Sequence, residues 1–331
     1  MSSSLSILGQ AVLATLSYCD QFAFPLTTTE VWQRLIWPVG QSTENVSKKT
    51  VRQMLQRLEN QGILEQKASH WVLKNQSDIV QIRRARHEVF LEKQPQLLPI
   101  LRFALKWPWI SAIFVTGSLA MQHSLAEDDI DLLIITPPRR LWLTRFAFLL
   151  YAEWCGRRRS WQKETPGSWC LNLWLDTDHM PVLPQKRSLY TAYEVMQAQP
   201  IFSRGGVAEL FQTQNAWILD WLPNSAAERE TGVWPDVKVG DVIQGWQVKG
   251  KPLWDWAMSM LEFLAWRTEY WYMQKHRTSE QVAPGFAFFH PRDTVGWIYR
   301  RWQTSLEAVV PKRVAVKIIE SYVAPSRSSE T

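Results

Sequence analysis

The chain contains little cysteine. Only Cys19, Cys155 and Cys170 occur among its 331 residues, far apart and without a Cys-x-x-Cys pair. This excludes a disulfide framework of the kind that stabilises small secreted domains. So few thiols are typical of a protein that works in a reducing compartment.

The sequence also lacks a long apolar run. Its most apolar stretches, 141–155 and 253–273, are interrupted by charged residues, whereas a membrane-spanning helix needs about 20 apolar residues in a row. The N-terminus has no basic segment followed by an apolar core, as a signal peptide would have. We therefore expect no membrane span and a cytoplasmic location.

Positive charge and tryptophan, in contrast, are well represented. The formal net charge is +6, which favours polyanionic partners such as nucleotides, RNA or DNA. Hydrophobic residues make up 46% of the chain, an ordinary value for a globular protein long enough for two or three domains. The 20 tryptophans indicate core and interface packing and single out no function.

The first 60 residues carry the signals of three helices. An apolar stripe over 5–19 predicts the first. Thr27 and Glu30 have the spacing of a capping box, which predicts that a second helix opens there. Ser47 can cap a third helix, and Gly62 ends it.

Two short β-prone runs, 63–66 and 70–73, follow as a predicted hairpin. Three helices and a hairpin resemble a winged helix-turn-helix domain. The outward side of its third helix would carry residues that suit phosphates and base edges: Lys48, Lys49, Arg52 and Gln53. The same residues also describe a normal solvated face, and many winged-helix domains contact only protein, so nucleic-acid binding and protein contact both stay open.

In the middle of the chain a tight turn follows one apolar run, and a carboxylate pair opens a second one. Gly117 and Ser118 come directly after a β-prone run, and 119–126 can form a helix behind them. A second strand then starts at Asp129 and Asp131, which alternation puts on one face. Asp128 falls on the opposite face, where we interpret it as a solvated residue ahead of the strand. Two such carboxylates suit Mg²⁺ bound together with substrate phosphates.

This combination resembles the signature of the DNA polymerase β-like nucleotidyltransferase superfamily, in which an apolar strand and Gly-Ser are followed, about ten residues later, by Asp-apolar-Asp. The resemblance implies Mg²⁺-dependent nucleotidyl transfer from an NTP. Gly117 and Ser118 would hold the triphosphate, and Asp129 and Asp131 would be catalytic and hold the metal. It further implies an α/β core built on a small mixed sheet.

Members of that superfamily usually have a third carboxylate on a later strand, and the candidate strand here is 170–176. Asn172 stands where that acid would fall, and could ligate the metal but not act as a base. Asp176 is on the same predicted face, four residues further on, and is the alternative third catalytic acid. Between the strands a basic cluster could bind the nucleotide, through Arg157 and Arg158, or could be an exposed, solvated loop. The whole cluster comprises Arg157, Arg158, Arg159 and Lys163.

These signals divide an α+β chain into a winged-helix domain (1–76), a connecting helix (77–110) broken at Pro95 and Pro99, a nucleotidyltransferase core (111–185) and a mainly helical C-terminal region (186–331). The C-terminal region should hold helices at 189–202, 209–224, 252–276 and from Val295 to about Leu306. The tryptophan-rich third of these is a core element or a face for self-association. His290, which precedes a proline, is interpreted as structural.

Two functions from different classes remain. The first is a magnesium-dependent enzyme that transfers a nucleoside monophosphate from an NTP to a hydroxyl of a small molecule, a protein or an RNA end. The second is a nucleic-acid-binding or regulatory protein with a degenerate nucleotidyltransferase domain, which Asn172 and the basic third helix favour. The sequence identifies neither the acceptor nor the preferred base.

Overall fold

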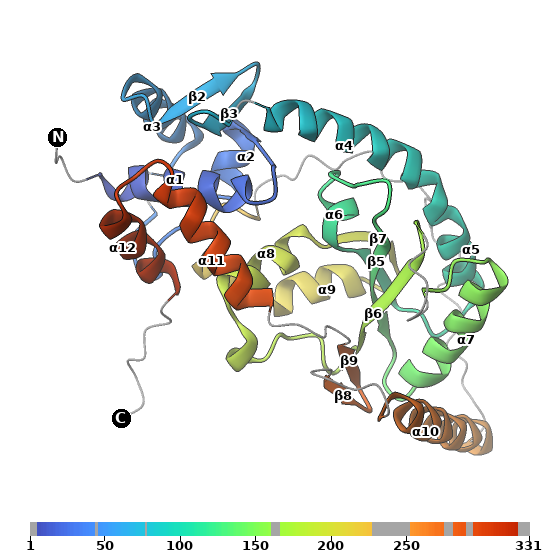
Figure 1. The fold of residues 1–331 in the computed structure, drawn as a ribbon. Helices are drawn as coiled ribbons and strands as arrows, with labels where there is room; N and C mark the ends of the chain where they lie inside the picture. Colours follow the sequence, from blue (N-terminus) through green and yellow to red (C-terminus); the bar gives the residue numbers. More distant parts are fainter. Residues whose placement is uncertain are drawn as a thin grey trace, which may run out of the picture.

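The computed structural model describes residues 5–43, 46–76, 78–159, 166–226, 252–274, 281–288 and 294–323. Within these ranges the chain is a mixed α+β protein with a three-stranded and a six-stranded sheet. A long helix runs from the small sheet to the large one, and the last two helices return to the N-terminal part (Figure 1). In the part of the chain that the structure describes, no helix combines the length and apolarity needed to cross a bilayer.

The N-terminal part contains the three predicted helices and the hairpin. Its elements are α1 (Ile7–Asp20), β1 (Leu26–Thr27), α2 (Thr28–Gln33), α3 (Lys48–Asn60), β2 (Leu64–Lys67) and β3 (His70–Leu73). Both predicted caps are present: Thr27 and Glu30 form a capping box before α2, and Ser47 caps α3. The hairpin strands pair antiparallel, and β1 joins β3 on the other side. Local sequence therefore sets the ends of these helices.

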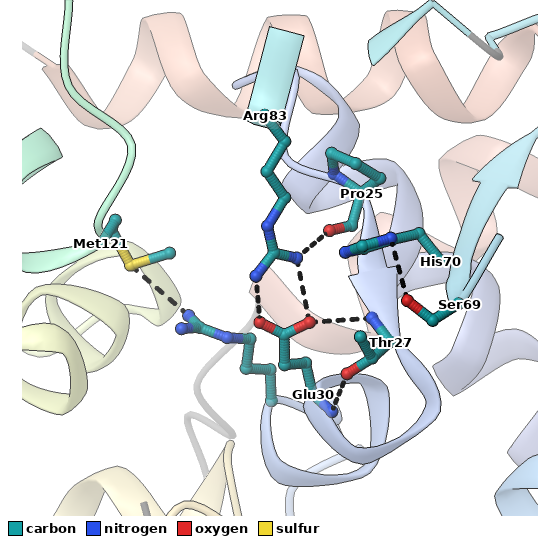
Figure 2. A network of polar contacts seen from close by, with 8 residues as sticks. Pro25, Thr27, Glu30, Ser69, His70, Arg83 and Met121 are labelled. Atoms are coloured by element: carbon teal, nitrogen blue, oxygen red, sulfur yellow. Dashed lines mark hydrogen bonds and ion pairs between the residues drawn. The ribbon is translucent and has the colours of Figure 1, made fainter. Parts of the chain in front are cut away.

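The connecting segment is a helix in three parts: α4 (Ile79–Lys93), the 3-10 helix η1 (Gln94–Leu97) and α5 (Leu98–Lys106). The 3-10 helix begins one residue before Pro95, and α5 begins one residue before Pro99, so the predicted break at these prolines is present as a change of helix type. Arg83 of α4 forms a bidentate ion pair with Glu30 of α2, with N–O distances of 2.5 and 2.9 Å, and also donates to the Pro25 carbonyl (Figure 2). This pair fixes the start of α4 to the N-terminal part.

The six-stranded sheet has the order β7-β4-β5-β6-β9-β8. Its strands are β4 (Ala112–Val115), β5 (Ile130–Thr136), β6 (Trp169–Asp176), β7 (Gln199–Ser203), β8 (Gln281–Ala283) and β9 (Phe286–Phe288). Among the described strands of this sheet, β5 and β6 are the parallel pair, and α7 (Leu141–Trp154) is the helix between them. Ile130, Leu132 and Ile134 face the core formed with α5 and α7, whereas Leu133 and Ile135 face the core that contains α8 (Leu189–Gln197).

The structure corrects three predictions about the chain from residue 185 onward. Residues 199–203 form the edge strand β7, and the predicted helix over 189–202 ends as α8 at Gln197. Pro200 is tolerated in β7 because an edge strand need not donate every hydrogen bond. The predicted core boundary at 185 is wrong for the sheet, since β7, β8 and β9 all belong to it. The predicted helix over 209–224 is instead α9 (Val207–Gln214) followed by the 3-10 helix η3 (Ala216–Asp220).

The C-terminal helices are α10 (Pro252–Gln274), α11 (Thr294–Glu307) and α12 (Lys312–Val323), of which α12 was not predicted. Trp302 of α11 is fully buried, and its indole N–H lies 3.0 Å from both the Ala14 carbonyl and the Ser17 hydroxyl of α1. Residues of α1, α8, α11 and α12 share one hydrophobic core. The predicted N-terminal and C-terminal domains are thus joined by common packing. His290 lies outside the described residues.

Candidate functional site

The site begins at the turn between β4 and β5, where the helix predicted over 119–126 is reduced to the single turn α6 (Gly117–Ala120). Gly117 has a φ of +64°, and a Cβ built on it would lie 2.5 Å from Oδ2 of Asp131. Glycine is therefore required twice, by the left-handed backbone and by the carboxylate against its Cα. The turn and Asp131 form one closely fitted unit.

Asp131 lies on β5, and Asp129 immediately precedes Ile130, the first residue of that strand. Pairing of Asp131 with Cys170 places its side chain on the sheet face of Leu133 and Ile135. Burial raises the pKa of Asp131 to about 6; a hydrogen bond from the Cys170 thiol opposes the rise, and the charge of Asp129 adds to it. The site therefore holds two carboxylates close enough to repel each other, with one of them poorly solvated.

Arg159 contacts Asp129 of this pair. Its Nε lies 3.1 Å from Oδ2 of Asp129, and its guanidinium lies 3.1 Å from Sγ of Cys170. The two arginines chosen from the sequence are engaged elsewhere: Arg158 pairs with Glu153 at 3.2 Å, and Arg157 donates to the Gly167 carbonyl. Sequence reasoning identified the basic cluster but could not tell which member turns toward the carboxylates. Lys163 of that cluster lies outside the described residues.

Ser118 and Asp128 hold the loop between the turn and β5. The Ser118 hydroxyl donates to Oδ2 of Asp128 at 2.6 Å, and the same oxygen accepts the Leu125 backbone N–H at 2.8 Å. The buried ammonium of Lys93 on α4 contacts the carbonyls of Leu125 and Asp128. The interpretation of Asp128 as merely solvated is thus corrected, because it anchors the loop that presents Asp129 and Asp131.

A bulge in β6 separates the two candidates for a third acid. Asp131 pairs with Cys170 but Leu133 pairs with Leu173, so β6 has one extra residue there. Asn172 lies in the bulge and donates its amide N–H to Sγ of Cys170 at 2.7 Å, next to the carboxylate pair.

Asp176 is not brought to the site. It pairs with Thr136, five residues beyond Asp131 on β5, which is about 16 Å along the strand. The extra residue in β6 also reverses the alternation, so that Asp176 falls on the opposite face of the sheet from Asp131. There its carboxylate contacts His179 Nδ1 at 2.6 Å. The prediction that Asp176 completes the carboxylate site is therefore wrong.

A further carboxylate that the sequence did not single out comes from α8. Glu194 is partly buried, and burial together with the charge of Asp131 raises its pKa to about 7. Burial, together with the charges of Glu194 and Asp131, also raises the pKa of Tyr190, one turn earlier on α8. No motif marks Glu194, because its position depends on how α8 packs over the sheet.

The donor types at this site fit Mg²⁺. Among the described residues no group of three or more His, Cys, Asp and Glu side chains could hold a metal ion. Mg²⁺, however, is commonly bound by only one or two carboxylates, with the remaining ligands from water and substrate phosphates. Asp129 and Asp131 match that requirement, and a cation between them would relieve their repulsion.

The residues predicted to contact nucleic acid lie at some distance in the fold, on α3. Lys48, Lys49, Arg52 and Gln53 are all exposed there, and Lys49 and Gln53 lie on the opposite side of the helix from the buried Val51 and Leu55. The face is therefore accessible to a partner.

Compared with protein-family models, with curated proteins and with solved structures, the chain matches none of them.

Proposed function

We propose that the chain is a magnesium-dependent nucleotidyltransferase that moves a nucleoside monophosphate from an NTP to a hydroxyl acceptor. The observation that carries the proposal is the fit of Gly117 against Asp131, which leaves no room for even a methyl group. Substrate phosphates that approach the Gly-Ser turn would then lie beside the carboxylate pair. Metal-assisted phosphoryl transfer requires the substrate phosphates and the metal-binding carboxylates to lie close together.

In this proposal Asp129 and Asp131 hold the metal. When bound, Mg²⁺ supplies positive charge that stabilises the negative charge developing on the phosphoryl oxygens. The chain adds Arg159, whose guanidinium can exchange Asp129 for a phosphate oxygen. The loop anchored by Asp128 and Lys93 keeps the carboxylates in place, and Ser118 serves the site by fixing that loop.

Proton removal from the acceptor hydroxyl is assigned to Glu194 of α8. A carboxylate with a pKa raised to about 7 is half protonated near neutral pH and can accept a proton efficiently there. The location of α8 supports the assignment: its residues Tyr193 and Val195 pack in the core on the sheet face to which Asp131 points, and Glu194 senses the charge of Asp131.

The order of elements supports the same proposal. The succession α1-β1-α2-α3-β2-β3 with a β1-β3-β2 sheet is the one expected of a winged helix. An antiparallel β4–β5 pair, with the Gly-Ser turn and the aspartates at its connection, followed by a parallel β6, agrees with the proposed nucleotidyltransferase core. The winged helix would then recruit the acceptor through α3.

A second candidate is a regulatory protein with a degenerate nucleotidyltransferase domain. The observation that favours it is Cys170, which stands opposite Asp131 where a third carboxylate could have stood. In this case the ion pair between Arg159 and Asp129 would take the place of the metal, and α3 would carry the function.

The test is transfer of label from α-labelled NTPs to RNA ends, protein and small hydroxyl compounds with Mg²⁺, and with EDTA as the blank. Asp129→Asn and Asp131→Asn should each abolish transfer and leave the fold intact. Asp176→Asn is the matched control. It removes a carboxylate of β6, the neighbour of β5, on the sheet face opposite Asp131, and it should retain transfer. Equal activity of Asp131→Asn and wild type would refute the assigned site. Absence of both transfer and Mg²⁺-dependent NTP binding would favour the regulatory protein.

A further inference from the structure

The helix α10 presents an apolar stripe to solvent, distant from the carboxylate site. Trp256 and Trp271 are 64% and 65% exposed, and Phe263 and Leu264 between them are about half exposed. Met260 belongs to the same stripe. A helix that is apolar on most sides is normally buried. The exposed stripe is therefore a candidate contact surface for another molecule.

Polar contacts on the opposite side hold α10 in place. The Glu262 carboxylate accepts hydrogen bonds from the backbone N–H groups of Trp142 and Leu143, at 2.8 and 2.9 Å. These N–H groups belong to the first turn of α7 and therefore have no partner within their own helix. Two turns later Glu269 forms an ion pair with Arg145 of α7. The stripe is therefore presented on a fixed helix, and α10 lies along α7 at the edge of the molecule (Figure 1).

The stripe is symmetric about its own middle. Trp256 and Trp271 lie seven residues on either side of the central pair Phe263 and Leu264, and are about 22 Å apart along the helix axis. In an antiparallel pair of α10 helices, Trp256 of one copy would meet Trp271 of the other, and Phe263 would meet Leu264. This is the self-complementarity that a two-fold interface demands.

The exposed area of α10 itself agrees with a second copy as the occupant. An aromatic side chain contributes about 150–250 Å² when covered, so Trp256, Phe263 and Trp271 offer roughly 350 Å² at their present exposure. With Met260 and Leu264 the stripe offers roughly 500 Å² per partner, or about 1,000 Å² in total, which is the lower limit expected of a biological interface.

We propose that the chain forms a two-fold symmetric dimer in which the α10 helices of two copies pack antiparallel through Trp256, Phe263, Leu264 and Trp271. Arg267, the charged residue within the stripe, then lies opposite Met260, and the two copies of Arg267 are about 10 Å apart along the axis, at a distance where salt screens their repulsion. A lipid surface is a poorer occupant. Helices that lie on membranes display lysine and arginine on the polar face, whereas Glu262 and Glu269 of α10 are turned to α7.

The dimer is tested by sedimentation velocity of the full chain over a wide concentration range. The expected species has twice the chain mass of 38.7 kDa. Leu264→Glu should weaken self-association roughly 100-fold or more, because a carboxylate from each copy would be buried at the two-fold axis, and the two like charges would repel each other. Leu91→Glu is the matched control, since Leu91 on α4 is 51% exposed and lies outside the stripe; it should dimerise like wild type.

Cross-linking checks the antiparallel arrangement. Leu264→Cys, next to the two-fold axis, should form a disulfide between copies under mild oxidation, whereas Leu91→Cys should not. Circular dichroism verifies that each variant is folded. A wild-type chain that stays monomeric at every concentration, or a dimer that Leu264→Glu leaves unchanged, would overturn the proposal. Co-sedimentation of a monomeric wild-type chain with phosphatidylglycerol vesicles would also overturn it and would assign the stripe to lipid.

Discussion

At the scale of single residues, Gly117 meets two requirements of the site: a left-handed backbone and space for the Asp131 carboxylate against its Cα. Gly117→Ala would place a methyl group 2.5 Å from the Asp131 carboxylate, in addition to the left-handed backbone with its φ of +64°. We expect this variant to lose Mg²⁺-dependent transfer and to unfold about 2–4 kcal/mol more easily, from backbone strain plus steric overlap. Urea denaturation and the transfer assay measure the two effects.

Gly205→Ala separates backbone strain from the contact with Asp131. Gly205 has a φ of +59°, and no other group lies within 4 Å of the point where an added Cβ would sit. It should lose only about 1–2 kcal/mol and retain transfer. Similar behaviour of the two alanine variants would show that the fit against Asp131 is unimportant.

His123 makes stability depend on pH. Burial, and then the charge of Arg86, lower its pKa to about 4, and Arg86 lies 2.8 Å from its Nε2. The folded ring stays neutral between pH 6.5 and 4 while the unfolded ring binds a proton, so the contribution of His123 to stability falls as the pH falls through this window.

The loss should amount to about 2–3 kcal/mol, the upper value set by 1.36 kcal/mol per pKa unit. His123→Gln keeps an acceptor for Arg86 but does not titrate, so its stability between pH 6.5 and 4 should change less than that of wild type by this amount. Urea titrations at several pH values make the comparison. Parallel curves for the two proteins would contradict the assignment to His123.

At the scale of secondary-structure elements, the ion pair between Arg83 and Glu30 couples α4 to α2. Burial tends to raise the pKa of Glu30, but the hydrogen bonds and charge of Arg83 lower it to about 2. Arg83→Met would leave a largely buried carboxylate without its partner, and should destabilise the fold by about 3–5 kcal/mol. The neighbouring Arg84 is 81% exposed and pairs loosely with Glu88, so Arg84→Met should change the stability by less than ~1 kcal/mol. Thermal and urea unfolding of the two variants give the comparison, and equal losses would mean that the pair does not join the elements.

Elements that depend on local signals were predictable from the sequence. The capping box at Thr27 and the cap at Ser47 need only residues within three positions of each other, and both occur as predicted. The strand β7 has no such signal, because its hydrogen bonds are made with β4, more than 80 residues earlier. In the sequence Pro200 therefore predicts the end of a helix, because nothing near it indicates the partner strand β4.

The candidate site was predictable to the same extent. Gly117 and Asp131 meet as the motif predicts, since the turn and the strand are close in sequence. Asp176 was misplaced because alternation along β6 was assumed to be unbroken, and the bulge after Cys170 reverses it. Bulges arise from pairing between strands, so neither the reversal nor the approach of Arg159 could be derived from the residues of β6 alone.

At the scale of the whole molecule, one hydrophobic core includes the helix at each end of the described chain. Tyr18 of α1 stacks on Tyr193 of α8 at 4.4 Å and meets the edge of Trp302 of α11. Trp302→Ala would remove a fully buried indole and two hydrogen bonds to α1. We expect a loss of about 3–5 kcal/mol and a single transition in which the N-terminal part and the large sheet unfold together.

Hydrogen exchange of the amides of α1 and of β5 measures this coupling. Both sets should lose protection by a similar factor in Trp302→Ala. Loss of protection confined to α1 would show that the N-terminal part unfolds by itself and that the shared core does not couple the two.

The packing of α11 and α12 on α1 has a consequence for synthesis on the ribosome. The partners of α1 are made about 300 residues after it, which at 5–20 residues per second is a delay of roughly 15–60 s. During this interval the apolar face of α1 has no native cover from α11, and the nascent N-terminal part is a substrate for chaperones that bind exposed apolar segments. Slow translation of the last third of the message should therefore lower the yield of folded protein more than slow translation of the first third.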